Sequence, residues 1–585
     1  MRQYIAPFLL VLLVVAGVWF PFLHILVVIF VAERLVAKKY ALTFIISTLL
    51  SILCVAAAVA LLSLLLDIFI PTEKQFRIME YILLVGGLLL LYFNRKTIKP
   101  VYRISRQEMT SSLLALAAMI FLLVPALHTK NSSDLIRFLS SGEDNASHFA
   151  MFNYSIIKES PPYLNHGETG LIGTLDTYPQ GPQSFYGFSY WSILGDRAYS
   201  PKILLALYYL MNVTICGALV FIVGQIVQFY AKPRLKVASA IIATSSAFIG
   251  SILFLIGWGF ITQLAALVYV LFVIYFIAGL SNDKRNEIST GTIAMLGLLL
   301  TGLSFAWYLM ILVVLVALIP FFIKIVRTKN ISLYVSSVVA GMAAFSPILL
   351  NLVASGGESP INQPGGVYKY EILGYSVIAI GLALFIYLYI TKKAKTLMTT
   401  SIMLFVISSF VLSGLVALYQ LLSIHTLEYY FFKSLFLLMI ISIVMLTVFT
   451  SYAFTRKLKK KSSFIYISAG ALSAFVIALL IINPIYPRVY FNNWFNHQLL
   501  PETLIVATES FSSTHKPQDI MYSIPCNHIR EYTADRWVGA LYLSEEAERG
   551  KLESKAFYSS TSQKEIMRYV VSRPGALLVS QPCEK

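Results

Sequence analysis

Two adjacent carboxylates and a histidine are the first residues that could do chemistry, in the long polar segment 129–200. Glu143 and Asp144 are followed by His148. If 145–158 is helical, Asp144 and His148 are one turn apart on the same face. Asp144 could then act as a general base, with Glu143 and His148 orienting a substrate. Asp144 could equally be the N-cap of this helix, and its residue type fits both roles.

A second set of reactive side chains lies near residue 430. Lys433 follows His425 and Tyr429 and stands a few residues inside an apolar run. A lysine in such a run is costly unless it is paired or functional, so we predict that it binds an anionic phosphate. The alternatives are snorkelling to the membrane interface and a salt bridge to Glu428.

The composition shows what kind of chain positions these residues. Of the 585 residues, 58% are hydrophobic and only 12% are charged, and the mean hydropathy is +0.76. These values predict a polytopic α-helical membrane protein. The net charge of +17 would suggest nucleic-acid binding in a soluble chain. Here Lys and Arg form short blocks between apolar runs, which is typical of topology signals, so we expect no nucleic-acid partner.

Apolar runs predict about 13 to 15 transmembrane helices. The first run, from Tyr4 to Val31, is interrupted by Pro21 and forms either one kinked helix or two short ones. The other predicted spans are 41–66, 79–93, 111–128, 202–229, 237–257, 260–280, 291–305, 307–325, 331–353, 373–391, 398–422, 429–453 and 463–483. The predicted parts of the chain are N-terminal helices in 1–128, an external loop in 129–200, a membrane bundle in 201–483 and a tail in 484–585.

Basic blocks fall at every second boundary between these spans, a consistent positive-inside pattern. The pattern places the loops 67–78, 129–200, 354–371 and 423–428, and the tail, on the non-cytoplasmic side. The spans themselves are almost free of charge. A transporter or flippase would carry charges inside its helices, so this favours chemistry at the outer surface.

The tail 484–585 changes character and predicts a small external α/β domain. The runs 520–524 and 576–580 are strand-like, and 544–555 and 562–571 favour helices. Cys526 and Cys583 could form a disulfide there if the tail is outside the cytoplasm. Cys54 and Cys216 lie inside apolar runs and are expected to be packing or lipid-facing residues.

Aromatic residues gather near the end of the polar segment. Tyr186, Tyr190 and Trp191 could stack on a sugar ring. An aromatic belt at the membrane interface explains them as well, and we favour the belt.

An acidic pair in the first large external loop, followed by His148, resembles the integral-membrane glycosyltransferases of the GT-C superfamily. Tyr178-Pro179-Gln180-Gly181 is similar to a Tyr-Pro-x-Gly segment of several bacterial members. The run from Tyr429 to Lys433 is similar to a Tyr-Tyr-x-x-Lys segment of arabinofuranosyltransferase-like members. About four spans precede the acidic loop, where many members have one. The resemblance therefore does not decide between an arabinofuranosyltransferase-like and a mannosyltransferase-like enzyme.

The resemblance implies transfer of a sugar from a polyprenyl-phosphate donor to a cell-envelope glycan, lipid or protein at the outer face of a bacterial cytoplasmic membrane. Inversion at the sugar needs one base, for which Asp144 is our candidate. The resemblance implies no definite cofactor. It leaves open whether a divalent ion (Mg or Mn) bridges Asp144 and the phosphate. The alternatives are a transporter or flippase and a polysaccharide polymerase or ligase. The expected substrate contacts are Lys433, Tyr178, Gln180, His425 and Tyr429.

Overall fold

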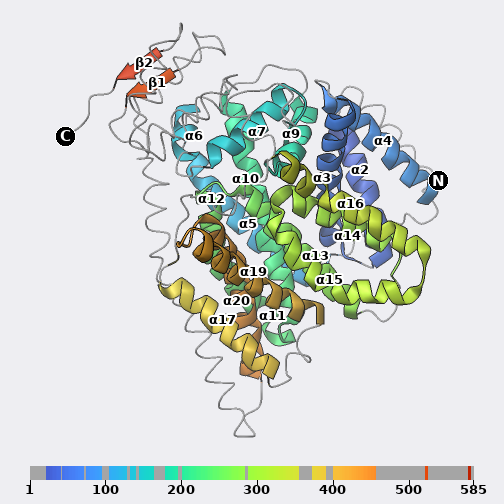
Figure 1. The fold of residues 1–585 in the computed structure, drawn as a ribbon, viewed down its shortest axis with the longest axis vertical. Helices are drawn as coiled ribbons and strands as arrows, with labels where there is room; N and C mark the ends of the chain where they lie inside the picture. Colours follow the sequence, from blue (N-terminus) through green and yellow to red (C-terminus); the bar gives the residue numbers. More distant parts are fainter. Residues whose placement is uncertain are drawn as a thin grey trace.

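A computed structural model gives the fold of most of the apolar part of the chain (Figure 1). It describes residues 22–40, 42–70, 74–94, 104–127, 129, 132–139, 144–161, 163, 178–194, 201–282, 288–354, 370, 372–390, 400–455, 521–524 and 577–580. Glu143, the span predicted at 463–483, the cysteines at 526 and 583 and the helices predicted in the tail lie outside these residues.

The described chain is dominated by helices. The N-terminal group consists of α2 (Phe22–Tyr40), α3 (Phe44–Phe69), α4 (Gln75–Asn94) and α5 (Arg106–Leu127). The polar segment forms α6 (Ser132–Leu139), α7 (Asn145–Ile157) and α9 (Gly181–Leu194). The remaining helices are α10 (Pro201–Tyr230), η1 (Pro233–Leu235), α11 (Lys236–Ala247), η2 (Phe248–Ile252), α12 (Leu253–Gly257), α13 (Ile261–Asn282), α14 (Thr290–Trp307), α15 (Leu309–Thr328), α16 (Ile331–Ala354), α17 (Ile372–Ile390), α19 (Thr400–Ser423) and α20 (Tyr429–Thr455).

The prediction of a polytopic α-helical membrane protein is confirmed. Eleven helices within the described residues are long and apolar enough to cross a membrane. The most buried of them, α10, α13 and α20, form the interior of the bundle, and α5 and α16 leave most of their surface exposed. An exposed apolar helix face is the expected boundary with lipid. The short helices α6, α7 and α9 gather at the top of the bundle in Figure 1.

One predicted span contains a local irregularity. The stretch 237–257 was expected as a single helix, but the π-helix η2 separates α11 from α12. The wider turn leaves the Gly250 carbonyl available to the Tyr370 hydroxyl, which donates to it at 3.0 Å. Satisfying a freed carbonyl through a neighbouring side chain is how membrane helices tolerate such irregularities.

The tail contains both predicted strands. β1 (Met521–Ile524) and β2 (Leu577–Ser580) pair in parallel, with Met521 opposite Leu577. Parallel neighbours need a long crossover connection, usually a helix. The residues between these strands are outside the described chain, so the α/β domain stays a prediction.

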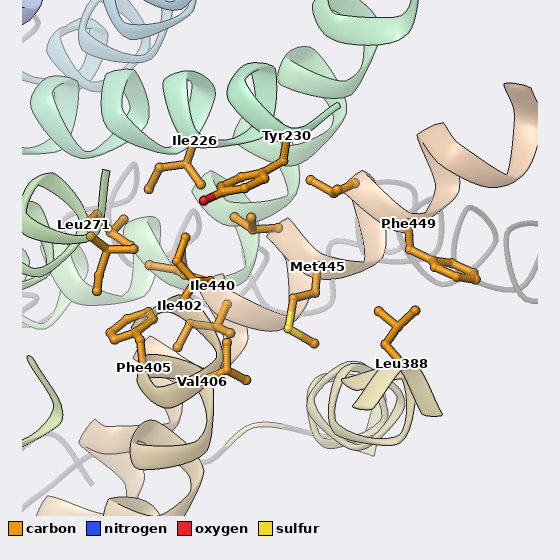
Figure 2. A pocket seen from close by; sticks show the side chains of 14 residues that line it. Ile226, Tyr230, Leu271, Leu388, Ile402, Phe405, Val406, Ile440, Met445 and Phe449 are labelled. Carbon is orange, nitrogen blue, oxygen red and sulfur yellow. The ribbon is translucent and has the colours of Figure 1, made fainter. Parts of the chain in front are cut away.

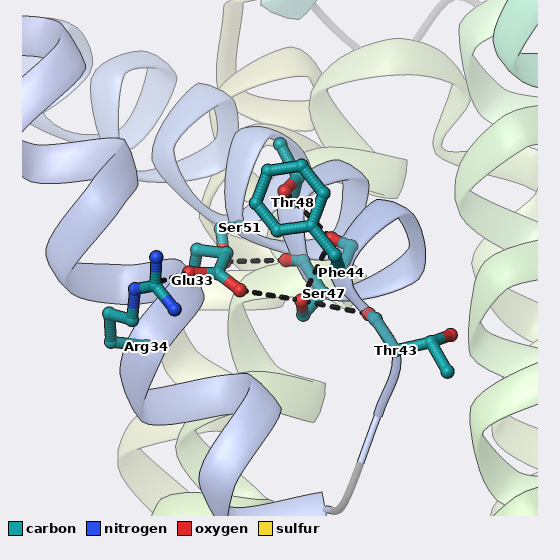
Figure 3. Close-up of polar contacts among 7 residues, drawn as sticks. All are labelled: Glu33, Arg34, Thr43, Phe44, Ser47, Thr48 and Ser51. Carbon is teal, nitrogen blue, oxygen red and sulfur yellow. Dashed lines mark hydrogen bonds and ion pairs between the residues drawn. The ribbon is translucent and has the colours of Figure 1, made fainter. Parts of the chain in front are cut away.

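The helices α2 and α4, which are not among the eleven helices described above, hold buried charged residues. Glu33 and Arg34 are both buried in α2, with Arg34 Nε 3.1 Å from Glu33 Oε2. Ser47 of α3 donates to the Glu33 carboxylate at 2.9 Å (Figure 3). His24 and Glu80 form a second buried pair between α2 and α4. The sequence pattern ended the first span at residue 31, whereas α2 continues to Tyr40 and contains the paired Glu33 and Arg34.

Candidate active site

Asp144 lies directly before α7, at the end of the bundle where α20 begins. Its backbone is helical (φ −75°, ψ −15°), and among the described residues its side chain makes no capping hydrogen bond. The carboxylate instead accepts a hydrogen bond from the Tyr429 hydroxyl, at 2.8 Å from Oδ2. Asp144 therefore occupies the N-cap position of α7 without capping the helix through its side chain, which bonds to α20 instead.

Lys433 is one turn into α20 and meets the same carboxylate. Its Nζ is 3.7 Å from Asp144 Oδ2, and its side chain is 6% exposed against 25% for Asp144. Lys433 also donates a hydrogen bond to the Tyr429 hydroxyl, which thus bridges the two charges. Neither snorkelling nor a salt bridge to Glu428 is observed. Burial strengthens the attraction between the charges but makes each costly if its partner is lost.

Aromatic rings surround the Lys433 ammonium. Its Nζ is 3.9 Å from the centroid of the Phe260 ring and 3.8 Å from that of Tyr429. Such contacts stabilise a cation that has left water. Gln263 at the start of α13 donates to the Lys433 carbonyl at 2.6 Å and so ties this turn of α20 to α13. Phe260 and Gln263 were not predicted, because in the sequence they look like ordinary residues of an apolar helix.

His148 is buried on α7 and is held by α9. The Gln183 amide nitrogen is 2.9 Å from His148 Nδ1, which acts as the acceptor when the amide donates. The Tyr178 ring packs 5.5 Å from the imidazole, centroid to centroid. The predicted spacing of one turn is correct, since the His148 amide donates to the Asp144 carbonyl at 3.1 Å. The two side chains are nevertheless positioned by different helices.

The segment Tyr178 to Gly181 forms the start of α9. Gln180 is buried, and its carbonyl accepts from the Ser184 amide at 2.8 Å, as a residue preceding a helix should. A Cβ on Gly181 would lie 3.0 Å from Phe305 Cβ and 3.1 Å from its carbonyl oxygen. The glycine therefore allows α9 to pack directly against α14. This part of the motif has a structural role in addition to any contact with substrate.

Asn145, the first residue of α7, fixes the position of Asp144. Its side-chain nitrogen donates to the Leu139 carbonyl at 2.9 Å, and its oxygen accepts from the Tyr208 hydroxyl at 2.9 Å. Gly259 packs against it in a left-handed conformation, with φ of +77°. A Cβ there would lie 2.7 Å from the Asn145 backbone nitrogen. The turn between α12 and α13 thus supports the residue beside the candidate base.

Two predicted substrate-binding residues have different outcomes. Tyr429 is part of the cluster, as described above. His425 is exposed, adopts a φ of +58°, and its Nδ1 is 3.2 Å from the Leu421 carbonyl in the last turn of α19. The fold therefore does not bring His425 to Asp144. Trp191, one of the three residues expected in an aromatic belt, is buried against Phe76.

The neighbouring tyrosines of α9 are partly buried and contact the adjacent helices. Tyr186 shares a hydrogen bond of 2.8 Å with the Thr214 hydroxyl. Burial raises the pKa of the Tyr186 phenol, so it stays neutral and can keep this contact. Tyr190 packs edge-on against Phe152 of α7, with ring centroids 5.9 Å apart. These rings join α9 to α7 and α10, which holds the site's short helices in place.

The cluster can bind an anion and accept a proton. Lys433 supplies a buried positive charge, and Asp144 supplies a partly open carboxylate next to it. Tyr178 and Tyr308 are within electrostatic range of Tyr430, so several phenols line the same region. Within the described part of the chain, no three His, Cys, Asp or Glu side chains come together as metal ligands. The ammonium beside Asp144 would also repel a cation at that carboxylate.

No protein-family model and no curated protein matches this sequence. The chemistry of the cluster therefore carries the functional conclusion.

Proposed function

We propose that the chain is a membrane glycosyltransferase that transfers a sugar from a polyprenyl-phosphate-linked donor to an acceptor hydroxyl at the outer face of a bacterial cytoplasmic membrane. The observation that carries this proposal is the contact between Asp144 and Lys433 at the end of the helical bundle. It pairs a candidate proton acceptor with a cation suited to a phosphate.

The donor phosphate would compete with Asp144 for Lys433. A phosphodiester oxygen is a strong acceptor for an ammonium group, and an apolar lipid tail would keep the phosphate at the membrane surface. When the phosphate engages Lys433, Asp144 loses part of the attraction that suppresses its basicity. Donor binding would thereby prepare the carboxylate for proton transfer.

The transfer step conserves atoms and charge. The acceptor oxygen attacks the anomeric carbon and forms the new glycosidic bond, while the bond from that carbon to the phosphate oxygen breaks. The acceptor proton passes to the Asp144 carboxylate, and the electron pair of the broken bond stays on the lipid phosphate beside Lys433. Attack from the opposite face inverts the configuration of the sugar.

The tail completes the proposed architecture. We keep residues 484–585 as a small extracytoplasmic α/β domain, on the same side as the polar segment, because both follow the same alternation of basic blocks. A domain beside the site could hold the acceptor. The acceptor itself is a glycan, lipid or protein of the cell envelope.

The direct test is sugar transfer by the purified full chain in lipid nanodiscs. Radiolabelled polyprenyl-phosphate arabinose, mannose and other sugars would be supplied with cell-envelope extracts as acceptors. We expect label to move from one donor to an acceptor in the parent protein and not in Asp144→Asn. Absence of transfer from every donor, or equal transfer by the variant, would overturn the proposal.

A transporter or flippase is the second candidate, because the first helices hold the buried His24–Glu80 and Glu33–Arg34 pairs. Ionisable residues inside membrane helices often mark translocation pathways. In proteoliposomes, a flippase would move a labelled lipid-linked sugar between leaflets without forming a glycosidic bond. Loss of that movement in Glu80→Gln, but not in Asp144→Asn, would favour this function over sugar transfer.

A further inference from the structure

An apolar cavity lies between α10, α13, α17, α19 and α20 (Figure 2). The space among its lining side chains is about 720 Å³ when the part open to the surroundings is included, and about 70 Å³ of it is available to the centres of water-sized molecules. Its lining residues on α20 extend from Ile440 to Phe449, which are 7 and 16 residues beyond Lys433, or roughly 10 and 24 Å along a helix. The cavity is therefore separate from the candidate active site.

Tyr230 is the single polar side chain among the lining residues, which are otherwise aliphatic, Met or Phe. Its phenol extends among these side chains (Figure 2). The hydroxyl oxygen is buried and has no hydrogen-bond partner in the described part of the protein. Burying a hydroxyl without a partner is costly, so a ligand with an acceptor oxygen at this depth would be stabilised there.

Three basic residues follow Tyr230 in the sequence, and the first of them lies beside the wall of the cavity. Lys232 Nζ is 4.1 Å from the centroid of the Tyr452 ring. On α20, Tyr452 is one helical turn beyond the lining residue Val448. Arg234 lies in η1, and Lys236 begins α11. No ion pair involves these three residues within the described ranges, since the observed pairs contain other cations. These residues therefore carry positive charge that a phosphate could neutralise.

We propose that this cavity binds an anionic glycerophospholipid from the adjacent membrane leaflet, which is the cytoplasmic one under the positive-inside rule. An acyl chain would fill the apolar space, an ester carbonyl would accept from Tyr230, and the phosphate would contact Lys232 and Arg234. From the membrane surface inward, such a lipid presents a phosphate, then an ester and then hydrocarbon. In the same direction the protein presents basic residues, then the Tyr230 phenol and then the apolar lining of the cavity.

The order of these groups separates this lipid from other ligands. A polyprenyl phosphate has the charge and the hydrocarbon but no ester carbonyl for Tyr230. Glycerol phosphate has the charge but no chain for the cavity. A basic block that only sets topology would need neither the cavity nor the buried phenol. We therefore expect tight binding only of a ligand that has a negative charge, a carbonyl oxygen and a hydrocarbon chain.

The test uses the delipidated full chain in detergent, with phosphatidylglycerol as the probe and native mass spectrometry as the readout. We expect one phosphatidylglycerol to bind at least ten times more tightly than phosphatidylcholine. The double variant Lys232→Gln/Arg234→Gln should lose most of this preference. Tyr230→Phe, which keeps the shape of the side chain, should weaken binding by about 2- to 10-fold, the usual effect of one hydrogen bond.

The matched control is Lys324→Gln/Arg327→Gln, a basic pair on α15 that also follows an apolar run but does not line the cavity. This control should bind like the parent protein. Equal loss in the control, equal binding of both phospholipids, or tighter binding of polyprenyl phosphate without dependence on Tyr230 would each overturn the proposal.

Discussion

Asp144 has the residue type of a helix cap, yet its carboxylate bonds to Tyr429 and approaches Lys433 on a helix that begins 285 residues later. Its contribution to α7 is therefore small, and its contribution to the site is large. Lys433 likewise serves the site, because its charge interacts with Asp144 inside the protein and does not lie at the lipid surface. Substitutions at these two residues can separate function from folding.

Asp144→Asn should leave the protein folded and nearly inactive. Asparagine can still accept the Tyr429 hydrogen bond, and no capping bond is lost, but the buried Lys433 loses its charged partner. We therefore expect a loss of stability of about 1–3 kcal/mol, the usual cost of leaving a buried polar group without its partner. Turnover should fall by roughly 100-fold or more, because an amide cannot accept the acceptor's proton. Thermal unfolding and sugar-transfer rates measure the two effects. Parent-like turnover in the variant would exclude Asp144 as the base.

Lys433→Ala should raise the donor KM by about 10- to 100-fold, the usual effect of one charge-assisted hydrogen bond. Lys433→Arg should retain part of the binding, since it keeps the charge but changes its shape. The control is Lys202→Ala, which removes an exposed lysine at the start of α10. Steady-state kinetics with varied donor provide the measurement. An unchanged donor KM in the Ala variant would leave Lys433 with a structural role only.

At the scale of elements, the site depends on how α7, α9, α13 and α20 meet. α7 was predicted at 145–158 and is observed at Asn145–Ile157, because its apolar spacing is local information. The pairing of Asp144 with Lys433 was not predictable in this way. Periodicity describes which face of a helix is apolar, and it does not say which distant helix will cover that face. The tight turn at Gly259 was missed for the same reason.

Gly259→Ala should destabilise the protein and reduce its activity. Alanine is strained at φ of +77°, and its Cβ would clash with Asn145. We expect a loss of about 1–3 kcal/mol, the usual cost of such a conformation. The control is Gly279→Ala on α13, where a Cβ meets nothing within 4 Å. If thermal unfolding shows the two variants to be equally stable, the turn does not support α7.

For the whole molecule, the class of protein was predictable and its charged interior was not. Composition alone fixes a helical membrane protein, since only apolar helices of sufficient length can span lipid. The buried Glu33 and Arg34 escape such reasoning because they pair with each other and Ser47 of α3 donates to Glu33, contacts that a hydropathy pattern does not contain. The stretches 67–78 and 129–200 lie at the same end of the bundle, since the Phe76 amide donates to the Glu159 carbonyl at 2.8 Å.

The sidedness of the bundle can be measured with introduced cysteines, in a background where Cys526 and Cys583 are replaced by serine. Ser132→Cys and Thr426→Cys should react with an impermeant maleimide added to intact cells. Thr328→Cys, after the basic end of α15, should react only after the membrane is opened. Labelling of Thr328→Cys in intact cells, with protection of the other two, would place the candidate active site in the cytoplasm.

The contact between Asp144 and Tyr429 also has a consequence for the synthesis of the chain. A ribosome adds about 5–20 residues each second, so the 285 residues between these two side chains take roughly 15–60 s to synthesise. During that interval the polar segment is already on its side of the membrane while its partner helix does not yet exist. A nascent or truncated chain therefore exposes Asp144 without a cation beside it. Only a chain translated through α20 assembles the site.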